Sequence, residues 1–496
     1  MNLHEISATC LDAGVATPGS GRTLSLERVA HLYLGTYVLL LVVGIVSILY
    51  AQTASTFPSL GLGMVAPVVR ARHLHSATMT YLCMIPGVPA ALGGVLLPRL
   101  LGQKHCANNG YALASLFVYW GAAVVIVGSV LGGGCDSGIL YSATYPDRSP
   151  VASVGVAVGV LLMGLSCSLN GIFAIKAMAN WLMDGPRTRG VPPVASAVCI
   201  NGIMQLLLLP VQCLTVTLMF QRYFGIRSSF DLSNGADPIL LRQLSWFYLH
   251  PLMLVALFPV FGLIDYAIEG NLAKNSSEKA PASAVLVYST IIGAVLGCFT
   301  SGIHLLQAGP SPWLSTMTSS LSLLLVVPFG LSFAHIHAKL CAVRKPTSAP
   351  ILFASGALLM LGLGFGAAVP LAILGVNSAL QGTDFIVGQI HFLSSAVCIL
   401  SVIGGMAVVW GGTQQPASRT ALAEKLGILA AVALIFTFSS QLLAGISEAQ
   451  HRSLGGITHR RWSVLIECGA LIAGVGFCAM VSTYLRARRG PKRQGH

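Results

Sequence analysis

Residues 29–51 read VAHLYLGTYVLLLVVGIVSILYA, a run of apolar side chains that contains no Asp, Glu, Lys or Arg. A helix that crosses the hydrocarbon core of a membrane needs about 20 such residues. This stretch therefore predicts a transmembrane helix near the beginning of the chain.

Comparable apolar runs follow one another to the end of the sequence. Short segments rich in Gly, Pro, Ser, Asn and Asp separate them, and these residue types favour turns. The pattern predicts an all-α integral membrane protein, a bundle of about 12 transmembrane helices. The further spans are expected at 74–98, 110–133, 151–175, 194–220, 238–264, 282–306, 313–337, 351–376, 384–410, 420–445 and 464–485.

The composition agrees with a chain that lies mostly in lipid. Of the 496 residues, 55% are hydrophobic and 9% are charged. A soluble chain carries roughly a quarter charged residues. The 54 glycines suit close helix packing in a membrane. The net charge of +13 is explained by basic residues in cytoplasmic loops, so we expect lipid as the surrounding partner and no nucleic acid.

The distribution of Lys and Arg predicts the orientation. If twelve spans alternate in direction, about twice as many Lys and Arg residues fall on the side that holds both termini as on the other side. Positive loops stay in the cytoplasm. We therefore expect a cytoplasmic segment at 1–28, a twelve-helix domain at 29–487 and a basic cytoplasmic tail at 488–496. Residues 1–28 are polar and predict no cleavable signal peptide.

The twelve cysteines are scattered and form no C-x-x-C pair, so neither a disulfide framework nor a cysteine metal site is expected. Histidine is the more informative residue. His75, His250, His304 and His391 fall at membrane depth. Ionisable residues there are costly and usually functional. A metal or heme iron is a good partner for such rings, and the alternative is a hydrogen bond to a neighbouring helix.

Distinct motifs surround these four histidines. Residues 75–86 read HSATMTYLCMIP, and a further proline follows at position 98. Residues 246–251 read WFYLHP and lead to PVFG at 259–262. Residues 302–304 read GIH, followed by PFG at 328–330. Residues 383–392 read TDFIVGQIHF, and residues 441–452 read QLLAGISEAQHR.

In this order and spacing, the motifs resemble subunit I of the heme-copper oxidases over nearly the whole chain. The resemblance implies that His75 and His391 are the axial ligands of a low-spin heme. It implies that Arg452 contacts a heme propionate and that Trp246 belongs to the cofactor-binding residues. His250 and His304 would be the remaining ligands of a copper site.

Several positions depart from the family pattern. Gln389 replaces the histidine that holds the second, oxygen-reducing heme, and a neutral amide is a poor iron ligand. Ile303 replaces the third copper imidazole. Leu254 replaces the tyrosine that is cross-linked to the copper histidine, Leu252 a common glutamate, and Ser332 a proton-channel lysine. Together these changes predict that the oxygen-reducing centre is degraded, with a second heme and copper both doubtful.

Four functions stay open at this point. One is a membrane hemoprotein with a single low-spin heme, of b or a type, that passes electrons in a respiratory-type complex. Another is a working terminal oxidase with unusual ligands, taking electrons from cytochrome c or quinol to O2. A third is a non-enzymatic heme or copper sensor or assembly partner. A transporter ranks last. The resemblance implies a bacterial inner membrane and a periplasmic subunit II-like or cytochrome c-type redox partner.

Overall fold

The computed structural model describes residues 26–57, 59, 65–88, 97–98, 100–101, 109–134, 150–184, 191–224, 238–272, 284–308, 311–343, 349–409, 417–451 and 459–488. Within these ranges the chain is helical. The elements are α2 (Leu26–Thr56), α3 (Val65–Ala77), η2 (Thr78–Met84), α5 (Asn109–Leu131), α6 (Pro150–Asp184), α7 (Pro193–Phe224), α8 (Pro238–Val255), α9 (Phe258–Leu272), α10 (Ala284–Thr300), η5 (Ser301–Ala308), α11 (Pro312–Leu324), α12 (Val326–Cys341), α13 (Ala349–Leu371), α14 (Leu374–Leu380), α15 (Asp384–Val409), α16 (Ala417–His451) and α17 (His459–Arg488).

The expected all-α membrane architecture is confirmed. In the described part of the chain, ten helical segments are long and apolar enough to span a membrane, and an eleventh is added if the bent pair α14–α15 counts as one span. The remaining expected span, 74–98, corresponds to the end of α3, η2 and the residues after them. Much of its second half lies outside the described residues.

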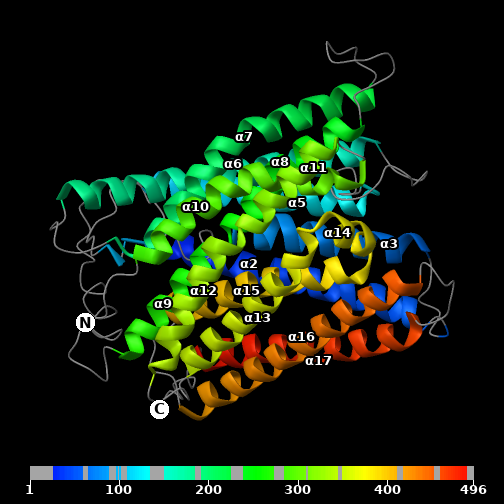
Figure 1. Cartoon of the computed structure of the whole chain (residues 1–496). Coiled ribbons are helices and arrows are strands. Elements are labelled where there is room, and N and C mark those ends of the chain that lie inside the picture. Colours follow the sequence, from blue (N-terminus) through cyan, green and yellow to red (C-terminus); the bar gives the residue numbers. More distant parts are fainter. Residues whose placement is uncertain are drawn as a thin grey trace.

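The long helices form one bundle, with α6 and α7 along one edge and α16 and α17 side by side along the opposite edge (Figure 1). Glycines set the closest crossings. A Cβ placed on Gly202 in α7 would lie 2.5 Å from the Cα of Gly171 in α6. Such backbone contact is typical of membrane helices, where small residues allow tight van der Waals packing.

Two tyrosines stabilise the helix that follows His75. This segment loosens into the π-helical η2 and ends near Pro86, which has no N–H to donate to a preceding carbonyl. Tyr37 donates to the Cys83 carbonyl at 3.0 Å, and Tyr119 donates to the Leu82 carbonyl at 2.8 Å. Side chains from α2 and α5 therefore satisfy carbonyls that lipid could not.

The helices that carry His250 and His304 are also interrupted. The expected span 238–264 divides into α8 and α9, with residues 256 and 257 forming a turn between them. The Pro259 nitrogen cannot donate there. The next span tightens from α10 into the 3-10 helix η5 at Ser301. Short non-α stretches of this kind often mark functional segments.

Gly202→Ala tests the importance of the α6–α7 contact. We expect the variant to lose about 1–3 kcal/mol of stability, because overpacking forces the backbones apart. The measurement is the thermal unfolding midpoint of the detergent-solubilised protein. Gly356→Ala is the matched control, since a Cβ there meets no heavy atom within 4 Å. Equal midpoints for both variants would contradict the close packing.

Candidate functional site

The first predicted histidine pair meets in the interior of the bundle. His75 lies in α3 and His391 in α15, 316 positions apart in the sequence. Their Nε2 atoms are 3.5 Å apart, and the two ring planes make an angle of 49°. The structure thus brings together the two residues that the motifs single out, with the same ring nitrogen of each facing the other.

Each of these rings is bound to an oxygen through its other nitrogen. His75 Nδ1 donates to the backbone carbonyl of Gly44 in α2 at 3.0 Å. His391 Nδ1 donates to the side-chain Oε1 of Gln441 in α16 at 3.0 Å. Sequence reasoning did not assign a role to either acceptor.

These hydrogen bonds decide the tautomers. A neutral imidazole has one N–H and one lone pair, and both protons are used at Nδ1. The two Nε2 atoms therefore point lone pairs at each other and cannot form a hydrogen bond together. Imidazole nitrogens lie about 2 Å from a metal ion that they bind, so two of them on opposite sides of one ion would be about 4 Å apart, close to the 3.5 Å between these two Nε2 atoms. Metal-ligating histidines almost always use their second nitrogen in this way, so the donor set fits a heme iron.

The helices around the pair pack closely because glycines lie at the contacts. A Cβ on Gly44 would lie 2.8 Å from the end of the Met79 side chain, so glycine gives that methionine room beside α2. A Cβ on Gly388 would lie 3.0 Å from the Gln441 Cβ, and Gly445 packs against the backbone of Phe385. These contacts bring α16 against α15 beside His391.

The second predicted pair, His250 and His304, forms a continuous hydrogen-bond chain. Thr300 Oγ1 donates to the Gly297 carbonyl at 3.2 Å, and so it accepts from His250 Nε2 at 2.9 Å. The remaining lone pair of His250 is on Nδ1, which lies 3.0 Å from His304 Nε2 and accepts its proton. The sequence left two roles open for these histidines, which are metal binding and a hydrogen bond to a neighbouring helix. The structure shows the hydrogen bond between helices.

A tryptophan packs against these hydrogen-bonded histidines. The Trp246 ring stacks on His304 with centroids 3.5 Å apart and planes at 10°. Within the described residues, the buried Trp246 Nε1 has no hydrogen-bond partner. Gly297 of α10 faces Leu254 of α8, where an added Cβ would lie at 3.4 Å, an ordinary van der Waals distance. Trp246 is thus placed beside the predicted copper ligands, as the motif order suggests.

The substituted positions contribute no additional metal ligand in the described part of the chain, where no group of three or more His, Cys, Asp and Glu side chains could hold a metal ion. Leu254 packs against Gly297, and Leu252 is fully buried. Gln389 is buried in α15, and Ile303 lies in η5 beside His304. Arg452, predicted to contact a heme propionate, lies outside the described residues.

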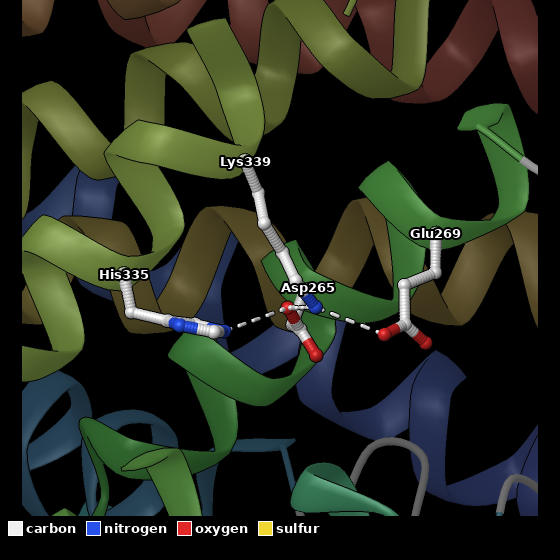
Figure 2. Close-up of polar contacts among 4 residues, drawn as sticks. All are labelled: Asp265, Glu269, His335 and Lys339. Carbon is white, nitrogen blue, oxygen red and sulfur yellow. Dashed lines mark hydrogen bonds and ion pairs between the residues drawn. The ribbon is translucent and has the colours of Figure 1, made fainter. Parts of the chain in front are cut away.

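A charged cluster, which we call the Lys339 cluster, consists of Asp265, Glu269, His335 and Lys339. Lys339 Nζ lies 2.7 Å from Asp265 Oδ1 and 2.9 Å from Glu269 Oε1, so one cation of α12 bridges two carboxylates of α9. His335 Nε2 lies 3.8 Å from the same Asp265 oxygen. Figure 2 shows the four side chains converging between the two helices. Asp265 and Lys339 are 74 positions apart in the sequence, and no motif in the sequence links them.

Comparisons with known proteins agree with the motifs. The family model described as "Cytochrome C and Quinol oxidase polypeptide I" matches residues 28–472. Cytochrome c oxidase subunit 1 of Thermostichus vulcanus is 23% identical over 72% of this chain and 63% of its own length. The same subunit of Cereibacter sphaeroides is 24% identical over 67% of this chain and 59% of its own length. The match spans less than two thirds of these relatives.

Lys339→Met tests the role of the Lys339 cluster. Asp265 is 1% exposed, so the variant leaves a buried carboxylate without its cation. Removing one partner of a buried ion pair costs about 3–5 kcal/mol, and we expect a clear fall in the thermal unfolding midpoint in detergent.

The double variant Asp265→Asn with Lys339→Met removes both charges and is expected to recover most of that loss. Lys425→Met, at an exposed position of α16, is the single-lysine control. A Lys339→Met protein that unfolds at the parental temperature contradicts a stabilising cluster.

Proposed function

This chain belongs to the family of cytochrome c and quinol oxidase polypeptide I, and from that premise we propose that it is a membrane hemoprotein with one low-spin heme between His75 and His391. In this role it passes electrons within a respiratory-type complex and does not itself reduce oxygen. The observation that carries the proposal is the pair of Nε2 lone pairs that face each other at 3.5 Å.

The protein supplies orientation and electronics to this site. Gly44 and Gln441 hold the Nδ1 protons, which keeps both Nε2 atoms free to ligate. Heme, when bound, supplies reversible one-electron chemistry. His75 and His391 would both ligate the iron and would leave no position for O2, so the residues suit electron transfer rather than gas binding.

The second site supports the loss of oxygen reduction. Gln389 stands where the family resemblance implies the proximal histidine, and Ile303 adds no nitrogen beside His304. The two remaining imidazoles are already paired with each other and with Thr300. A redox-active copper is held best by more imidazole ligands than two. We infer that neither copper nor a second heme is retained.

The partner and location follow from the same proposal. A subunit II-like protein or a cytochrome c-type protein would exchange electrons at the periplasmic face of a bacterial inner membrane, with both termini of this chain in the cytoplasm. We propose heme b over heme a, because Gln52 stands near where some family members place an arginine close to the formyl group. Arg452 is proposed to contact a propionate.

Counting cofactors tests the function directly. We expect one heme and no copper per purified polypeptide, and no change of the reduced spectrum when carbon monoxide is added. His75→Ala and His391→Ala should each remove the heme absorbance, because one axial ligand is lost. His250→Ala is the matched control and should retain the heme. Two hemes, one copper and a carbon monoxide shift would instead identify a working oxidase, and normal heme content in either axial variant would contradict the ligand assignment.

Ile303→His tests why copper is absent. The variant places a third imidazole beside His250 and His304, and we expect copper content per polypeptide to rise above that of the parent after growth with added copper. Ile303→Gln serves as the control of similar size without an imidazole. If copper content does not change, the hydrogen-bonded pair has closed the pocket by repacking.

A further inference from the structure

We propose that Gln441 is the positioning residue that sets the redox balance of the low-spin site, because its amide oxygen controls how strongly His391 donates to the iron. This inference rests on the proposed function, since it presupposes a heme ligated by His391. It assigns a role to a residue that would act on the iron only through His391.

The two axial histidines differ in the kind of acceptor that holds them. The acceptor for His75 is a backbone carbonyl, that of Gly44, and its strength is fixed by the peptide chemistry. The acceptor for His391 is a side chain, and its strength changes with the residue type at position 441. Of these two hydrogen bonds, the one from His391 is therefore open to tuning by sequence.

Gln441 is held rigidly enough to act in this way. Its side chain is buried at 6% exposure, and its Cβ faces the space left by Gly388. Phe438 lies one turn earlier on the same face of α16 and stacks on the His391 ring, with centroids 5.1 Å apart and planes at 13°. One surface of α16 thus fixes both the plane of the imidazole and the direction of its Nδ1–H bond.

The chemical consequence follows from charge. A stronger acceptor at Nδ1 draws the proton away from the ring and makes Nε2 a better donor. A better donor stabilises ferric heme more than ferrous heme, because the ferric ion carries the larger positive charge. The midpoint potential of the one-electron couple then falls. The Nδ1 proton remains on the ring in both oxidation states, so only the electron is transferred.

The experiment is a redox titration of the purified protein with its heme, followed by visible absorbance. Gln441→Glu strengthens the acceptor and is expected to lower the midpoint potential. Gln441→Leu removes the acceptor and is expected to raise it. Outer partners of metal ligands typically change affinity 10-fold or more, and a tenfold change in the ferric-to-ferrous affinity ratio is about 59 mV.

Two further variants isolate the hydrogen bond from general effects. Gln441→Met keeps an unbranched side chain of similar length without an amide. It is expected to raise the midpoint potential as Gln441→Leu does, and it takes the place of that variant if Gln441→Leu folds poorly. Ser440→Ala is the neighbouring control, since the Ser440 hydroxyl donates to Phe436 in its own helix. Its potential should equal that of the parent.

The outcomes separate this inference from the proposed function. If the parent lacks heme, or if His75→Ala and His391→Ala both retain it, the proposed function fails and this inference fails with it. If the heme depends on both histidines but the Glu, Leu and Met variants keep the parental potential, only the role of Gln441 is overturned. Shifts of the Glu and Leu variants in the same direction also overturn it.

Discussion

Inside a membrane every polar hydrogen needs an acceptor that belongs to the protein, because lipid offers none. The site depends on this constraint. The Nδ1 protons of His75 and His391 are held by Gly44 and Gln441, and the remaining lone pairs are left facing one another. The same rule explains why Tyr37 donates to a carbonyl of η2 at the point where that helix loosens.

Close packing makes these short bonds possible. Gly388 on α15 lacks a side chain where the α16 backbone approaches, and Gly44 on α2 leaves room for the Met79 side chain, so both acceptors reach the histidines. Glycine therefore has a specific role beside the first histidine pair, in addition to its general contribution to helix packing in lipid.

The sequence predicted the membrane architecture and the family well, because apolar length and ordered motifs are local signals. It also singled out the four histidines that the structure places in two pairs. It did not find Gln441, Gly44 or Thr300, since a hydrogen-bond acceptor has no sequence signature until the helices are packed. The carboxylates of the Lys339 cluster were missed for the same reason, as Asp265 lies 74 positions before its lysine.

The hydrogen-bond chain at the second pair has a direction. Protons point from His304 to His250, from His250 to Thr300, and from Thr300 to the Gly297 carbonyl. A carbonyl oxygen accepts and has no proton to hand on. A proton entering at His304 would arrive at a closed end, and all three donors would have to rotate before a second could follow. The hydrogen-bond chain through His250 and His304 thus ends at the Gly297 carbonyl and offers no onward path for a proton.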